Sequence, residues 1–176
     1  MLIEGTFDPL LILFFSLLHE GGHLLAIGVL GGDVRGFFGR GQGFGLSVGG
    51  LSYKGELIAA ASGPLVSLLL AGLFALFGHW YGGEELAYCA FANGALGVMN
   101  LLPVMPLDGG RILRAVLALY CTPDQGRLIG RAVGLCCLLP LLGLAFWQFL
   151  CSGYNLSLLF ICFYLVSLLG ENGNDV

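Results

Sequence analysis

The chain alternates long apolar runs with short polar connections. Five apolar stretches predict membrane-spanning helices, at residues 9–30, 57–78, 86–119, 128–150 and 155–170. The third stretch is too long for one plain span and contains Pro103 and Pro106, so we expect a helix that breaks partway across the membrane and then resumes. This pattern predicts an all-α polytopic membrane protein with about five transmembrane helices.

The connection at residues 31–56 differs from the others because glycine dominates it. Its short alternating apolar pieces, GFGLSV and GLSY, are typical of strands rather than helices. We expect a strand-like or re-entrant segment at the membrane surface between the first two helices.

Composition supports a membrane protein. The 176 residues are 57% hydrophobic and only 10% charged, and the mean hydropathy of +0.92 exceeds that of an ordinary water-soluble domain. We expect a single transmembrane domain over residues 1–176, with core spans in 9–120 and two additional spans in 128–170. The formal charge of −4 and the lack of a basic cluster argue against the recognition of nucleic acid, or of lipid by a polybasic segment, as the main activity.

Positive residues predict the orientation in the membrane. With five spans, all seven Lys and Arg residues fall on one side, which should be cytoplasmic: Arg35, Arg40, Lys54, Arg111, Arg114, Arg127 and Arg131. The C-terminus would lie on that side as well, and the N-terminus on the other.

The segment LLHEGGHLLAIG, residues 17–28, places polar residues inside the first apolar run. His19 and His23 are four apart, so they share one helix face and can both bind one metal ion. Glu20 directly follows His19, so on a helix its carboxylate lies beside the metal rather than on it. A glutamate in that position can act as a general base. A pair of hydrogen-bonded core histidines is the alternative. Burial within a membrane favours function, because unpaired polar groups there each destabilise the fold by several kcal/mol.

Asp108 is the best candidate for a third ligand. It lies in NLLPVMPLDGGR, residues 100–111, close to the predicted break in the third span. Gly109 and Gly110 let the backbone turn sharply there. Two His and one Asp form an open site suited to Zn²⁺. The alternative is that Asp108 caps the helix that follows.

These two motifs resemble those of a known family. HEGGH and NLLPVMPLDGGR fit the HExGH and NxxPxxPxDGGR patterns of the site-2 protease family of intramembrane zinc metalloproteases, over about residues 9–120. The resemblance implies that His19, His23 and Asp108 bind one Zn²⁺ per chain and that Glu20 is the catalytic general base. It also implies that Asn100 contacts the substrate backbone or the developing oxyanion; an interhelical hydrogen bond is the alternative for Asn100.

The resemblance further implies the activity and the partners. A zinc metalloendopeptidase of this family, a hydrolase, cleaves a peptide bond in or near a transmembrane segment during regulated intramembrane proteolysis. The expected partners are a membrane-spanning substrate, such as a membrane-tethered transcription factor precursor, the lipid bilayer and a regulatory membrane protein. The compact chain resembles the sporulation-type branch, which implies a bacterial cell membrane. One departure is Ser67, where many members carry asparagine.

Two other functions compete with proteolysis. One is a non-catalytic membrane scaffold that keeps a structural zinc site, although such a site does not need Glu20. The other is a proton- or ion-conducting protein that uses the same polar residues as a relay. Against a relay, those residues concentrate at one locus instead of forming a path across several helices.

Overall fold

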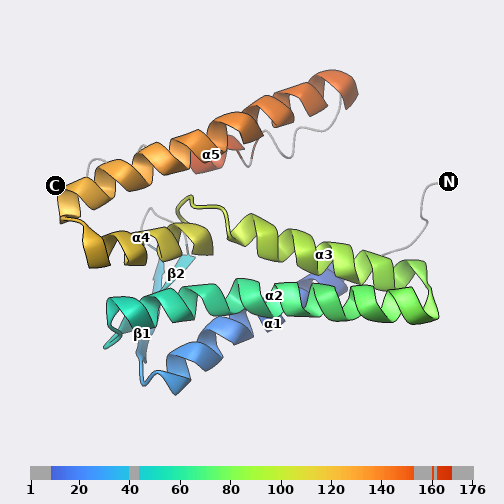
Figure 1. Ribbon diagram of the computed structural model, residues 1–176, viewed down its shortest axis with the longest axis horizontal. Helices are drawn as coiled ribbons and strands as arrows, with labels where there is room; N and C mark the ends of the chain where they lie inside the picture. The colour runs from blue at the N-terminus through green and yellow to red at the C-terminus, as the bar shows by residue number, and fades with distance from the viewer. Residues whose placement is uncertain (1–8, 40–43, 153–159, 161, 168–176) are drawn as a thin grey trace.

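The fold is a helical bundle with one small hairpin (Figure 1). The computed structural model describes residues 9–39, 44–152, 160 and 162–167. In chain order the elements are α1 (Pro9–Val29), β1 (Asp33–Gly39), β2 (Phe44–Gly49), α2 (Tyr53–Tyr81), α3 (Glu84–Asn100), α4 (Asp108–Tyr120) and α5 (Pro123–Ser152).

Three described helices are long and apolar enough to cross a membrane, and they are α1, α2 and α5. These coincide with three of the five predicted spans. The predicted third span is divided into α3, of 17 residues, and α4, of 13 residues. At about 1.5 Å per residue, each is shorter than the roughly 30 Å hydrocarbon layer. The predicted fifth span, 155–170, lies mostly outside the described residues, so five spans are not established.

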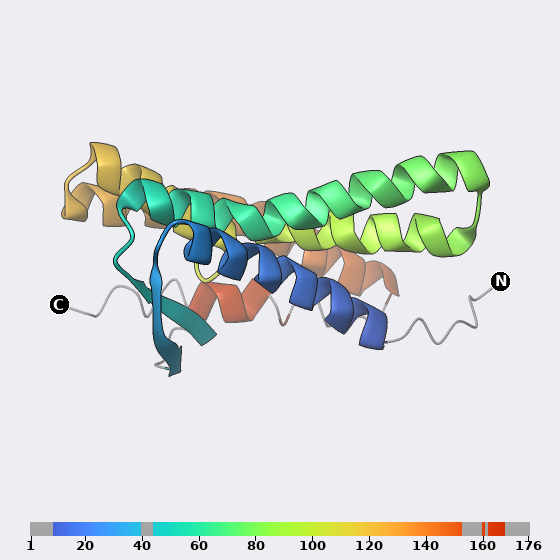
Figure 2. The same cartoon turned by 90° about the horizontal axis from the view of Figure 1, so that it is seen from below.

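The connection between α1 and α2 forms an antiparallel strand pair. Asp33 of β1 faces Gly49 of β2, and Gly39 faces Phe44 at the other end, with an irregularity between Val34 and Gly36. Figure 2 shows this hairpin projecting from the helices next to the end of α1. The described fold is therefore not purely helical.

Small residues allow the helices to pack closely around α2. A Cβ atom on Gly22 of α1 would come within 2.9 Å of the Val66 side chain, and one on Gly97 of α3 within 2.9 Å of Leu68. Gly82 and Gly83, with φ of +69° and +110°, turn the chain between α2 and α3. Helices in lipid associate through such close contacts, because lipid supplies little hydrophobic force to drive them together.

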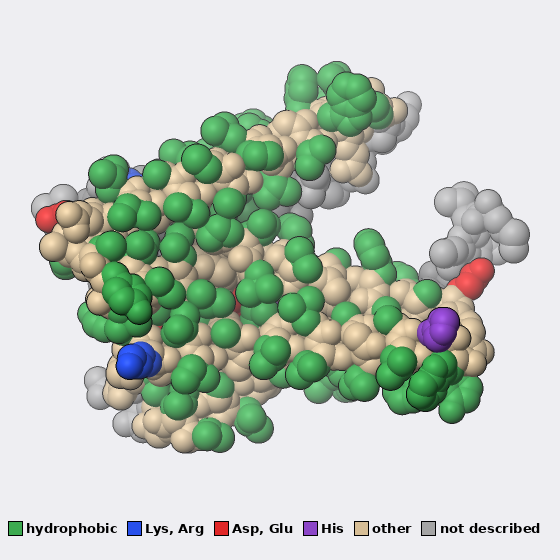
Figure 3. Space-filling model, in the orientation of Figure 1, with side chains coloured by type: hydrophobic (Ala, Val, Ile, Leu, Met, Phe, Trp, Pro, Cys, Tyr) green, Lys and Arg blue, Asp and Glu red, His purple; other side chains and the backbone are tan. Residues whose placement is uncertain are grey.

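Hydrophobic side chains cover much of the face of the bundle that Figure 3 shows. Large side chains such as Leu25, Phe91 and Trp147 are each at least two-thirds exposed, whereas the buried residues of α2 are all small or polar: Gly55, Ala59, Ala60, Gly63, Pro64 and Ser67. This arrangement suits a helix bundle surrounded by lipid. Polar side chains in the bundle interior must therefore find their hydrogen-bond partners within the protein.

Candidate metal centre

Two histidines of α1 lie buried against α2. His19 is 4% exposed and His23 is 2% exposed, and their ring centroids are 5.0 Å apart. Both lie on the same face because they are one helical turn apart. Each ring is held at its Nδ1 atom by a group of α2, which fixes the direction of its Nε2 atom.

The outer partner of His23 is the backbone carbonyl of Ala59, 2.7 Å from Nδ1. A carbonyl oxygen can only accept, so Nδ1 carries a proton and donates it. The outer partner of His19 is the Ser67 hydroxyl, whose Oγ lies 2.9 Å from Nδ1. In a neutral ring whose Nδ1 is protonated, Nε2 presents a lone pair to a metal or a proton donor.

Asp108 completes the group from the first turn of α4. Its Oδ2 atom lies 3.0 Å from Nε2 of His19 and 3.1 Å from Nε2 of His23. The α4 N-cap is Leu107, and no side chain caps the helix, so the capping alternative for Asp108 does not hold. The carboxylate faces the histidines instead, while its Oδ1 atom accepts from Arg111 at 3.4 Å.

The convergence of these atoms fits a cation. A neutral His23 with its proton on Nδ1 directs a lone pair at a carboxylate oxygen, and two acceptors at that distance repel each other. A divalent cation among the two Nε2 atoms and Oδ2 removes the repulsion. Two imidazoles and one carboxylate are also a donor set that zinc prefers when one coordination position stays open.

Glycines shape the space around the three ligand atoms. A Cβ atom on Gly63 of α2 would collide with Nε2 of His23 and lie 2.8 Å from Nε2 of His19. A Cβ atom on Gly109 would overlap the backbone of Leu101 and Leu102. Gly63 therefore leaves room for the rings, and Gly109 lets α4 start directly against the preceding loop, where Asp108 reaches the histidines.

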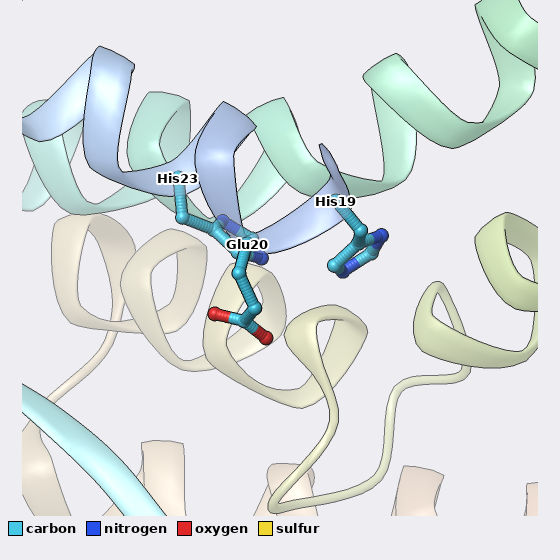
Figure 4. Close-up of side chains that lie close together, drawn as sticks. All are labelled: His19, Glu20 and His23. Carbon is cyan, nitrogen blue, oxygen red and sulfur yellow. The ribbon is translucent and has the colours of Figure 1, made fainter. Parts of the chain in front are cut away.

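Glu20 lies next to His19 and His23 but makes no hydrogen bond with Asp108. One ligand atom from each of His19, Glu20 and His23 lies within 4.8 Å of the others. Figure 4 shows the three side chains projecting from the same side of α1. Unlike the histidines, Glu20 is exposed at the helix surface. Its carboxylate is thus close to both imidazole rings yet accessible.

Comparison with known proteins identifies the family. Peptidase family M50 matches residues 83–141, a segment that includes Asp108. A zinc metalloprotease of Methanocaldococcus jannaschii is 39% identical over 70 residues, which cover 37% of this chain and 21% of that protein. The solved structure of a site-2 protease from the same organism has a TM-score of 0.68 at 25% identity, covering 95% of this chain and 77% of that one. These matches in sequence and in fold support assignment of the chain to the site-2 protease family.

A second relative of this chain comes from Ralstonia nicotianae, and its name also contains the words zinc metalloprotease. It is 34% identical over 95 residues, which cover 49% of this chain and 19% of that protein. The matched segments span about a fifth of the length of these two relatives.

Asn100 is not brought into the metal group. Its Nδ2 atom donates to the Leu96 carbonyl of its own helix at 3.0 Å, and the side chain is half-buried. The interhelical hydrogen bond considered as an alternative is absent from the contacts of the described residues. A contact with substrate remains a prediction for Asn100.

Three residues that shape the centre were not predicted from the sequence to do so. Ala59 acts through its backbone, so its side-chain type carries no signal. Gly63 belongs to the GP pair of α2, where a glycine inside a helix is itself a hint of close approach. Ser67 was noted only as a departure from asparagine, yet its hydroxyl contacts His19. Helix α2 therefore still provides a polar contact, through Ser67 in place of asparagine.

Proposed function

We propose that this chain is an intramembrane zinc metalloendopeptidase that hydrolyses a peptide bond in or near the transmembrane segment of a membrane-tethered protein. The observation that carries the proposal is the convergence of His19, His23 and Asp108 through atoms 3.0 and 3.1 Å apart inside an apolar bundle. Similarity to zinc metalloproteases supports the choice of metal.

His19, His23 and Asp108 would hold one Zn²⁺ per chain, with Ser67 and Ala59 fixing the two rings. When bound, zinc polarises the scissile carbonyl and makes water a stronger acid. Arg111 holds the second oxygen of Asp108, so the carboxylate keeps its other oxygen turned toward the histidines. These partners orient the ligands before substrate arrives.

Glu20 is the proposed general base. Its exposed carboxylate accepts a proton from the attacking water and then donates that proton to the leaving amine nitrogen. The carboxylate returns to its ionised state at the end of the cycle. A structural metal site needs no such group, so Glu20 favours catalysis over a scaffold. The concentration of buried polar atoms at one place likewise favours catalysis over proton conduction.

The hairpin is the proposed place where substrate docks. A helix in lipid hides its peptide carbonyls in its own hydrogen bonds, so it must unwind before hydrolysis. The strands β1 and β2 form a two-stranded sheet whose outer edges can pair with an extended chain. Asn100 would contact the substrate backbone or the oxyanion. Substrates of this kind include membrane-tethered transcription factor precursors, released under the control of a regulatory membrane partner.

The remaining parts of the proposal concern organisation. Residues 1–176 act as one transmembrane metalloprotease domain. The face that carries Lys54, Arg111, Arg114, Arg127 and Arg131 lies toward the cytoplasm of a bacterial cell, because positive residues are retained on that side.

The test compares the wild type with Glu20→Gln in bilayers, using Glu85→Gln as a control at the exposed start of α3. Metal content and cleavage of a model transmembrane substrate are measured together. We expect about one zinc per chain in all three proteins and cleavage by the wild type and Glu85→Gln only. Cleavage by Glu20→Gln at the wild-type rate, or absence of metal from the wild type, would overturn the proposal.

A further inference from the structure

A cavity lies beside the proposed metal centre. It has a volume of about 590 Å³ and is lined by the start of α2, by α4 and by the first turns of α5. These segments gather at one end of the bundle (Figure 1). None of His19, Glu20, His23 or Asp108 lines this cavity, although Met105 and Gly110 beside Asp108 do.

Three arginines line the cavity without an ion-pair partner. Arg114 comes from α4, and Arg127 and Arg131 come from α5, where a spacing of four places both on one face. Every ion pair among the described residues involves Asp108, and none involves these three guanidinium groups. Among the described residues, Glu56 is the one carboxylate on the cavity wall. The cavity therefore carries excess positive charge.

Most of the remaining wall is apolar. Leu113 and Leu117 of α4 and Pro103 of the preceding loop contribute to it. A Cβ atom on Gly126 or Gly130 of α5 would meet Leu117 at 3.7 or 3.8 Å, so α5 passes close to α4 here. The cavity thus combines an apolar floor with guanidinium groups, and such a surface suits an amphipathic anion.

We propose that this cavity binds an anionic phospholipid, with its phosphate among Arg114, Arg127 and Arg131 and its first acyl carbons over Leu113 and Leu117. Guanidinium groups form paired hydrogen bonds with phosphate oxygens. Basic pockets between transmembrane helices on the cytoplasmic side are typical sites for anionic headgroups. A headgroup with hydroxyls, as in phosphatidylglycerol, also gives Glu56 donors to accept from.

Two other occupants fit less well. Membrane-adjacent segments of proteins on the positive side are rich in Lys and Arg, so the arginines would repel most of them. A small soluble anion would neutralise the arginines but leave the apolar floor uncovered. The lipid satisfies both parts of the wall, and it holds α4 against α5 beside the loop that positions Asp108.

The test measures lipid binding and is independent of zinc and proteolysis. The purified full chain is freed of lipid in detergent and titrated with phosphatidylglycerol or phosphatidylcholine, and bound lipid is counted by native mass spectrometry. The variants are Arg131→Gln, the double variant Arg127→Gln/Arg131→Gln, and the charge-retaining Arg127→Lys/Arg131→Lys. Lys54→Gln is the matched control, because it removes an exposed positive charge near the same end but does not line the cavity.

We expect the wild type to prefer phosphatidylglycerol by about tenfold or more, and the double glutamine variant to lose roughly 30-fold in affinity for it. Arg131→Gln should lose about fivefold, while Lys54→Gln should bind as the wild type does. The lysine variant keeps both positive charges and should retain most binding, which assigns the loss in the glutamine variant to charge rather than to impaired folding. Equal affinity for the two lipids, or equal losses for Lys54→Gln and Arg131→Gln, would overturn the proposal. Displacement of the lipid by inorganic phosphate alone would overturn it in favour of a soluble phosphate ligand.

Discussion

His23 of α1 donates its Nδ1 proton to the backbone carbonyl of Ala59 in α2, 36 residues further along the chain and 2.7 Å away. The Ser62 hydroxyl donates to the same carbonyl at 2.7 Å. Because the acceptor is a backbone atom, no change of side chain at position 59 removes it directly. The orientation of a proposed metal ligand therefore depends on how closely α1 approaches α2.

Ser67→Ala should weaken zinc binding by about 10- to 100-fold, because it removes the group that orients His19. Zinc affinity is measured by competition with a chelator of known affinity. Ser16→Ala is the control, since the Ser16 hydroxyl bonds only within α1, to the Ile12 carbonyl. An unchanged affinity in Ser67→Ala would show that the hydroxyl does not support the ring.

Gly63→Ala should abolish stoichiometric zinc binding while the helices still form. The added methyl group would occupy the space in front of both Nε2 atoms, so one ring must move. Gly72→Ala, in the same helix, has nothing within 4 Å of the added carbon. That control should be neutral or stabilising by up to about 1 kcal/mol, since alanine favours a helix over glycine. Metal analysis after purification compares the zinc content of the two variants. Full zinc content in Gly63→Ala would contradict the prediction that a methyl group there displaces a histidine ring.

Gly109→Ala should destabilise the whole protein by about 1–3 kcal/mol or more, because the added carbon overlaps backbone rather than a movable side chain. Gly143→Ala in α5 is the control, with open space around the added carbon. Thermal unfolding in detergent measures both variants. If Gly109→Ala and Gly143→Ala have equal melting temperatures, the loop before α4 can shift at little cost in stability and does not hold Asp108 in place.

Removing the metal should lower both stability and activity. Without a cation, the carboxylate of Asp108 faces the lone pair of the His23 ring, and the repulsion loosens α4 from α1. A chelator at saturating concentration should therefore lower the melting temperature of the wild type, and added zinc should restore it. Asp108→Asn should show no such response, because it removes one ligand. If the chelator leaves the melting temperature of the wild type unchanged, the result argues against a metal at this position.

Much of the centre could be predicted from local pattern. The spacing of His19 and His23 fixes their common face, since helical geometry depends only on neighbouring residues. The prolines and glycines around Asp108 predicted the interruption that separates α3 from α4. The number of spans was less predictable, because apolar composition does not reveal whether an interrupted run crosses the membrane once or not at all.

The apolar helices, the interruption before Asp108 and the shared face of the two histidines can be predicted from the sequence, because each follows from interactions between near neighbours in the chain. Contacts between helices establish that Ala59 and Ser67 hold the rings, that Gly63 leaves space in front of them and that Asp108 meets both Nε2 atoms. The structure also placed three unpaired arginines around one cavity. These relationships join residues 36 to 89 positions apart in the ligand group, and such contacts arise from the packing of whole helices rather than from local sequence.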